Sequence, residues 1–232
     1  MHPLLDAHSH LPQPGSPEPD CWRVVCGTRE TDWAAVLVHA AGCARVIPML
    51  GLHPWFVTEA AVGWDLRLEA LLRAHRSGVG ECGLDFSRQS ADRAAQEVAF
   101  RAQLRLAHAL GRPVAIHAVK AWGRLLELLR EEGVPPGGAL VHGYSGSPES
   151  ALALQGLGVF LSFSGDLLAP NRPKLHEAMG AVADDHLLLE SDGTAILGAV
   201  LEAAATLRGV EPELLAAQTW ENGRQCFKEW LA

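Results

Sequence analysis

The chain has 232 residues, 48% of them apolar and 20% charged, which is ordinary for a globular enzyme with a substantial core. We expect a single domain over residues 1–232. The formal net charge of −8 excludes a general attraction to nucleic acids or membranes, so a polyanionic substrate would need a local binding site.

The cysteines and the N-terminus indicate the compartment. The five cysteines are an odd number without a C-x-x-C pair, which indicates reduced thiols rather than a disulfide scaffold. The N-terminus has no basic segment followed by an apolar one, and no apolar run approaches membrane-spanning length. We therefore expect a cytoplasmic protein that does not enter a membrane, and nothing in the sequence indicates an obligate protein partner.

Short apolar segments alternate with helical patterns along the chain. The first apolar segment ends on His8 and His10, and a proline-rich stretch over residues 11–20 then predicts a loop. Strands are predicted at residues 4–10, 22–26, 45–50, 79–86, 114–116, 139–141, 159–163 and 187–189. Helices are predicted at residues 31–41, 65–76, 91–110, 121–132, 147–157 and 172–179, with two or three more before the C-terminus.

This order of elements predicts the fold class. The strand segments are apolar throughout rather than alternating, which is typical of parallel strands covered on both faces. Eight such segments, mostly followed by helices, predict an α/β fold of the (β/α)8 TIM-like barrel type, slightly shorter than the usual ~250 residues. A doubly wound open sheet is the alternative. It fits less well because side chains that could share one site follow both the first and the last strand.

Side chains that bind metals stand at the ends of five predicted strands. His8 and His10 point to the same face of the first strand, because side chains alternate along a strand. Glu81 lies in an apolar strand, where a carboxylate needs a partner or a metal. Each residue alone has an ordinary structural explanation, but chance placement is a poor explanation for the whole set. The predicted metal ligands are His8, His10, Glu81, His117, His142 and Asp192.

Six ligands are too many for one tetrahedral zinc ion and suit two divalent cations that share a carboxylate. We assign one cation to His8, His10 and Asp192 and the other to His117 and His142, with Glu81 bridging. Asp192 is also expected to act as the base that orients the attacking water, so Glu81 and Asp192 are the predicted catalytic residues. The ligand set leaves zinc, manganese, magnesium, iron and nickel open.

Seven short motifs carry a family resemblance. They are residues 6–11 (DAHSHL), 51–54 (GLHP), 80–85 (GECGLD), 116–117 (IH), 142–146 (HGYSG), 190–192 (ESD) and the late Thr219-x-x-Asn222. Together and in this order they resemble the TatD-like metal-dependent hydrolases, often called TatD deoxyribonucleases. The resemblance implies an amidohydrolase-type barrel with a two-metal site at these positions, which cleaves phosphodiester bonds in DNA.

The chain departs from the family pattern at three places near the substrate. A proline-rich loop replaces the helix that usually precedes the second strand. Val119 stands where the family usually has arginine, with Lys120 next, and Asp192 leads almost directly into a helix instead of a long loop. These departures motivate an alternative function, in which the same two metals hydrolyse a small ester, amide or phosphoester. A non-catalytic barrel is disfavoured because all six ligands are present.

Two residues at the predicted barrel mouth are expected to contact the substrate. His53 ends the third strand within the GLHP motif, where a capping or core role is nearly as good an explanation. Lys120 follows the fifth strand and could meet a phosphate. We expect the partner to be DNA or another phosphodiester, bound locally at the metal site.

Overall fold

The computed structural model describes residues 3–13, 20–88 and 92–231. Parallel strands follow one another around one sheet in sequence order. The strands are β1 (Leu5–Ser9), β2 (Trp22–Cys26), β3 (Val46–Leu50), β4 (Gly78–Asp85), β5 (Val114–Val119), β6 (Ala139–Val141), β7 (Phe160–Phe163) and β8 (Leu187–Leu189). The α-helices are α1 (Glu30–Gly42), α2 (Trp64–Ala74), α3 (Arg93–Leu110), α4 (Trp122–Glu132), α5 (Pro148–Gln155), α6 (Pro173–Ala181), α7 (Leu197–Arg208), α8 (Pro212–Cys226) and α9 (Lys228–Leu231).

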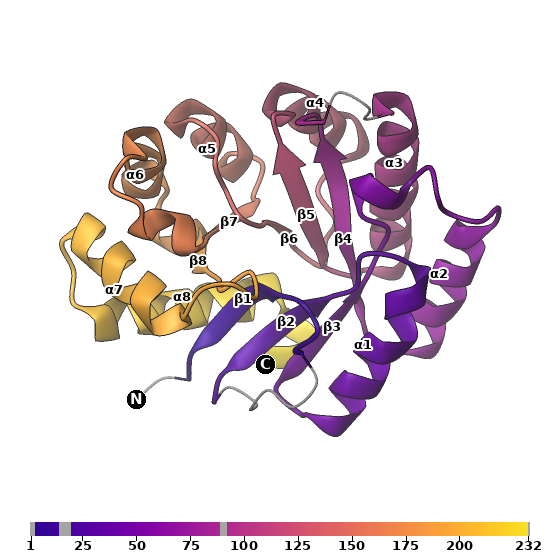
Figure 1. Cartoon of the computed structure of the whole chain (residues 1–232), viewed down its shortest axis with the longest axis horizontal. Helices are drawn as coiled ribbons and strands as arrows, with labels where there is room; N and C mark the ends of the chain where they lie inside the picture. The colour runs from indigo at the N-terminus through magenta and orange to yellow at the C-terminus, as the bar shows by residue number, and fades with distance from the viewer. Residues whose placement is uncertain (1–2, 14–19, 89–91, 232) are drawn as a thin grey trace.

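The sheet closes into a barrel because its first and last strands meet. Strand β1 contacts β8, and the helices lie around the outside of the strands (Figure 1). Just after β8, the backbone N–H of Asp192 donates to the carbonyl of His8 at 3.1 Å. The Ser191 N–H and hydroxyl donate to the Asp6 carboxylate at 2.8 and 2.5 Å. The predicted (β/α)8 barrel is therefore confirmed, and the open sheet is excluded.

Two apolar layers explain why the strands are apolar on both faces. In β5, Ile116 packs outward in the layer between strands and helices, whereas its neighbour Ala115 faces the barrel interior. Phe227 and Leu231, from the C-terminal end of the chain, belong to the same interior cluster as Ala115. Because adjacent side chains of a strand face opposite ways, both layers require apolar residues at consecutive positions.

Local signals account for several helix ends. Asp92 accepts a hydrogen bond from the Ala95 N–H at 2.9 Å and begins α3, which ends at Gly111 with φ +63°. Ser147 caps α5, whose first residue is a proline. Helix α1 begins at Glu30, one residue before its predicted start at residue 31. The Asp32 carboxylate accepts hydrogen bonds from the N–H and hydroxyl of Thr28 in the preceding turn.

The end of one strand differs from the sequence prediction in a way that affects a predicted ligand. Strand β5 continues to Val119, so His117 lies within the strand instead of ending it. The pairing of β5 with the long strand β4 explains this extension, since the ladder continues to Val119. The predicted start of the third helix at residue 91 and part of the predicted loop over 11–20 lie outside the described residues.

Two further sequence predictions concern membrane-spanning segments and disulfides. Within the described residues, no helix combines the length and the apolar character that a membrane crossing requires. The five cysteines all fall in that part of the chain, and none is paired in a disulfide.

Candidate metal centre

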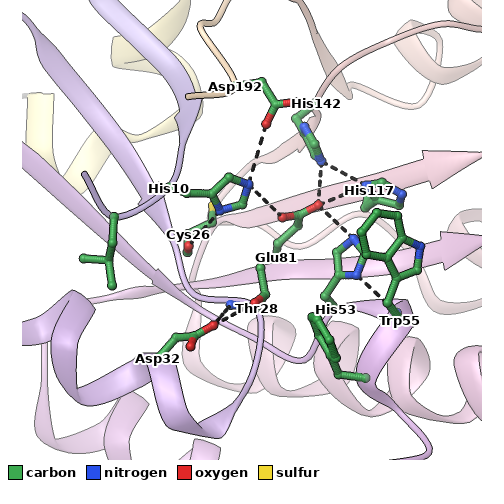
Figure 2. A pocket seen from close by; sticks show the side chains of 12 residues that line it. His10, Cys26, Thr28, Asp32, His53, Trp55, Glu81, His117, His142 and Asp192 are labelled. Atoms are coloured by element: carbon green, nitrogen blue, oxygen red, sulfur yellow. Dashed lines mark hydrogen bonds and ion pairs between the residues drawn. The ribbon is translucent and has the colours of Figure 1, made fainter. Parts of the chain in front are cut away.

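Glu81 lies at the centre of a ring of histidines at the C-terminal ends of the strands (Figure 2). Its side chain is almost fully buried, and it enters the barrel mouth from β4. The two carboxylate oxygens face different partners. Oε2 faces His8 and His10 from β1, and Oε1 faces His117 and His142 from β5 and the end of β6. One carboxylate therefore separates two groups of potential metal ligands.

On the Oε2 side, the nitrogen and oxygen atoms are too far apart for direct hydrogen bonds. His8 Nε2 lies 3.6 Å from Glu81 Oε2 and 3.8 Å from Asp192 Oδ1. His10 Nε2 lies 3.7 and 3.6 Å from the same two oxygens. Two atoms that bind one cation at about 2.1 Å each stand roughly 3 to 3.5 Å apart. The observed distances are only slightly longer than this spacing.

On the Oε1 side, three histidines stand at hydrogen-bond distance. The distance to Glu81 Oε1 is 2.8 Å from His142 Nε2, 3.0 Å from His117 Nδ1 and 3.2 Å from His53 Nε2. His142 also stacks on His8, with ring centroids 3.6 Å apart, so the two ligand groups adjoin. The structure thus brings all six predicted ligands to one place and adds His53 to them.

The electrostatics of this cluster favour cation binding. Burial would raise the pKa of Glu81, but His142 and the hydrogen bonds from His117, His142 and His53 hold that pKa well below its usual range. Burial, followed by the neighbouring His142, lowers the pKa of His8 well below its usual value. An ionised carboxylate and a neutral imidazole are the forms in which these side chains bind metals.

One buried nitrogen without a hydrogen-bond partner indicates whether these residues can hold a metal. His8 is fully buried, and its Nε2 has no hydrogen-bond partner although two carboxylates lie nearby. A buried polar atom without a partner costs free energy, so such atoms are rare unless they serve a ligand. This nitrogen faces Glu81 and Asp192. The cluster therefore offers the donor types that a divalent cation requires, together with a nitrogen lone pair that is free to bind it.

Comparison with known proteins identifies the family. The family model "TatD related DNase" matches residues 19–228. The chain belongs to this family. The "3'-5' ssDNA/RNA exonuclease TatD" of Edwardsiella piscicida is 34% identical over 222 residues, which cover 90% of this chain and 82% of that protein. The protein of the same name from Klebsiella pneumoniae (strain 342) is 33% identical over 215 residues, which cover 82% of this chain and 78% of that protein.

A solved structure agrees with this TatD assignment at the level of the fold. YJJV, a TatD homologue from Escherichia coli K12, superimposes with a TM-score of 0.90 at 22% sequence identity. The superposition covers 97% of this chain and 98% of the other. At this identity the likeness shows the barrel only, and the site must be argued from the residues themselves.

Glu190 is a residue of this TatD-family site that sequence reasoning missed. It is fully buried beyond β8, and its Oε1 lies 3.5 Å from His142 Nδ1. The Ser162 hydroxyl of β7 donates to its other oxygen. Glu190 thus faces the Nδ1 side of the His142 ring at ion-pair distance, without a hydrogen bond, while Nε2 is turned towards Glu81. The missed signal resembles the one that revealed Glu81, because both carboxylates adjoin apolar strand residues.

Asp85 has a comparable relation to His117. Its Oδ2 lies 3.2 Å from His117 Nε2 and accepts from the Trp55 indole at 2.7 Å, while Oδ1 accepts from the Ser87 N–H. Burial would raise the pKa of Asp85, but the hydrogen bonds from His117, Ser87 and Trp55 hold it well below its usual range. Asp85 therefore both fixes its own loop and contacts a predicted metal ligand.

Cys26 is a second residue that the sequence reasoning passed over. It ends β2 with its side chain inside the barrel, and its Sγ lies 3.5 Å from His8 Nδ1. The carbonyl of the same residue lies 3.2 Å from His10 Nδ1. Cys82, by contrast, packs in the outer layer between strands and helices.

The two residues predicted to bind substrate lie in different surroundings. His53 is buried, its Nδ1 accepts from the Trp55 N–H at 3.1 Å, and its Nε2 faces Glu81. Both ring nitrogens are therefore engaged, and the capping role considered for His53 is realised. Lys120 is exposed at the end of β5 with φ +53°. Substrate contacts by these two residues stay predictions.

Proposed function

We propose that this chain is a divalent-metal-dependent nuclease that hydrolyses phosphodiester bonds in single-stranded DNA or RNA, working from the 3' end. The observation that carries the proposal is the position of Glu81, whose two oxygens face two separate groups of histidines. The names of the relatives from Edwardsiella and Klebsiella support the substrate and the direction of cleavage.

The proposed centre holds two divalent cations, with the assignment that the sequence suggested. His8, His10 and Asp192 would bind one, His117 and His142 the other, and Glu81 both. The cations would supply the Lewis acidity that activates water and offsets the charge developing on the phosphodiester. Asp85 and Glu190 hold His117 and His142 in the orientation that this binding requires.

Asp192 is the proposed general base. Its side chain is 40% exposed at the barrel mouth, whereas that of Glu81 is only 3% exposed. An Asp192 oxygen turned towards solvent can accept the proton of an attacking water while the other faces His8 and His10. The residue has φ +49°, a sparsely populated region for a residue with a side chain. Its N–H bond to the His8 carbonyl holds this conformation.

The shape of the mouth favours a strand over a small ester. A cavity of about 430 Å³ extends from Glu81 and His117 towards Trp55. A second cavity of about 690 Å³ shares His117 and extends towards Arg172. The candidate centre lies where the two cavities meet, so the 3'-terminal nucleotide can occupy one cavity while the rest of the strand extends through the other.

The proposal is tested by digestion of a single-stranded oligonucleotide labelled at its 5' end, with magnesium, manganese or zinc added. The wild-type protein should shorten the strand step by step from the 3' end. Glu81→Gln and His8→Ala should lower the rate by about a hundredfold or more. Glu213→Gln, which changes an exposed carboxylate on α8, should leave it unchanged.

Metal content measured on the same preparations separates the outcomes. A folded protein that binds the cations but cleaves no DNA or RNA would refute the nuclease proposal. A panel of small esters, amides and phosphoesters would then test the alternative substrate class.

A further inference from the structure

One side of the barrel mouth carries a row of arginine–aromatic pairs. One pair links the segments after β2 and β3, one links those after β3 and β4, and the third lies between β4 and the start of α3. The pairs, with the distance from each guanidinium carbon to the ring centroid, are Arg29 over Phe56 (4.0 Å), Arg88 over Trp55 (3.7 Å) and Arg93 over Phe86 (4.6 Å). Although the chain has a net charge of −8, this row places positively charged guanidinium groups beside the site that would bind an anionic substrate.

Trp55 is the member of this row whose ring lies beside a predicted metal ligand, His117 (Figure 2). It lines the same cavity as Glu81 and His117, and its ring centroid is 6.3 Å from that of His117. Despite this position, 41% of its surface is exposed. An exposed indole at the edge of a site is available to a ligand in a way that a core tryptophan is not.

The orientation of the Trp55 ring is fixed. Its Nε1 donates to Asp85 Oδ2 at 2.7 Å, and its edge meets His53 with ring centroids 4.9 Å apart. Asp85 is itself buried and held by its own loop. A ligand that stacks on this ring therefore meets a surface already in place, and little side-chain entropy is lost on binding.

We infer that Trp55 and Arg88 form a binding platform for the nucleobase adjacent to the scissile phosphate, an inference that rests on the proposed function. Bases of single-stranded nucleic acids stack on aromatic rings and on arginine guanidinium planes without strong sequence preference. Arg88 covers one face of the indole, so a base would stack on the free side of the guanidinium or on the opposite face of the ring. The guanidinium of Arg88 adds a positive charge beside the phosphate that enters the cavity.

The same geometry explains a preference for single strands. A base in a duplex is paired and stacked on its neighbours, so it must be separated from them before it can reach an indole in a side cavity. An unpaired strand end meets no such cost. The platform thus contributes to substrate selection as well as to affinity.

The test compares oligonucleotides that carry one abasic nucleotide at successive positions from the 3' end. For the wild type, removal of the base at one position should lower kcat/KM by about tenfold or more. In Trp55→Ala, the intact strand should be cleaved more slowly by the same factor, and the abasic substitution should have no further effect. Trp55→Phe should keep part of the discrimination, and Arg88→Ala should weaken it. Leu214→Ala, at an exposed site on α8, should match the wild type.

Trp55 could instead act only through Asp85 and His117, and the substrates distinguish the two roles. If Trp55→Ala slowed intact and abasic strands equally, the base platform would be refuted. If no nucleic acid were cleaved, the proposed function would fail, and binding of labelled strands to the metal-free protein would decide the platform separately. Fluorescence anisotropy would measure this affinity. A lower affinity of Trp55→Ala for the intact strand alone would support the base platform, and an unchanged affinity would refute it.

Discussion

Asp192 Oδ1 lies 3.8 Å from His8 Nε2, although the two residues belong to opposite ends of the chain. Closure of the barrel between β1 and β8 creates this contact, and the hydrogen bond from the Asp192 N–H to the His8 carbonyl fixes it. An open sheet would have placed these residues far apart. The candidate centre is thus a direct product of the closed topology.

Replacement of Asp192 by asparagine tests its role as a base. The substitution keeps the size of the side chain but removes its ability to accept a proton, so kcat should fall by about 10²- to 10⁴-fold. Cation binding should weaken less, because His8, His10 and Glu81 stay in place. Steady-state kinetics and metal analysis measure the two effects. Activity within a few-fold of the wild type would contradict the assignment of Asp192 as general base.

Glu190→Gln tests whether the buried carboxylate orients His142. We expect cation affinity to fall by roughly 10- to 100-fold, since a glutamine cannot offer the charge that holds the ring. Titration against a competing chelator dye gives the affinity. Glu213→Gln is the matched control, because it removes the same charge at the surface. Equal affinities for the two variants would show that Glu190 serves packing alone.

His53 is tested with a pair of variants. His53→Ala removes the donor to Glu81 Oε1 and should lower cation affinity by about tenfold. His53→Gln places an amide N–H within reach of the same oxygen and should retain most of the affinity. If glutamine were as damaging as alanine, the imidazole itself would bind the cation or the substrate.

Gly83 is expected to determine whether β4 and β5 pair correctly. Its φ is +139°, and a Cβ at this position would lie 2.0 Å from the carbonyl oxygen of His117. Gly83→Ala should therefore lower the free energy of unfolding by about 2 kcal/mol or more. Urea denaturation of the metal-free protein measures this change.

Gly180→Ala in α6 is the control for Gly83, since a Cβ there meets nothing within 4 Å. It should raise the free energy of unfolding by up to ~1 kcal/mol, because alanine is the better helix former. A Gly83 variant as stable as the wild type would show that the strand pair tolerates displacement.

Acid should release the cations. Burial lowers the pKa of His10, His117 and His142, but the surrounding carboxylates outweigh it and raise each pKa above its ordinary value. Protons then compete with the cation at pH values where an ordinary histidine is already neutral, so affinity should rise with pH between about 6 and 8. Calorimetry in buffers of different ionisation enthalpy should detect proton release on binding. Affinity independent of pH over this range would contradict the prediction.

The barrel, the family and the positions that meet at the mouth could all be predicted from the sequence. Parallel strands buried on both faces need continuous apolar runs, and the barrel brings the residue after each run to one rim. His8, Glu81 and Asp192 could therefore be selected from local pattern alone. The family motifs, from the first strand to the last helix, gave the same result independently.

The contacts that orient these residues are visible only in the folded protein. Glu190 meets His142, Asp85 links Trp55 to His117, and His53 turns to Glu81. Each of these contacts joins side chains from different strands or loops, and its geometry depends on strand register and loop conformation. A local pattern records the burial and period of one segment, but it contains no information on which atoms of two distant segments come within a few ångströms.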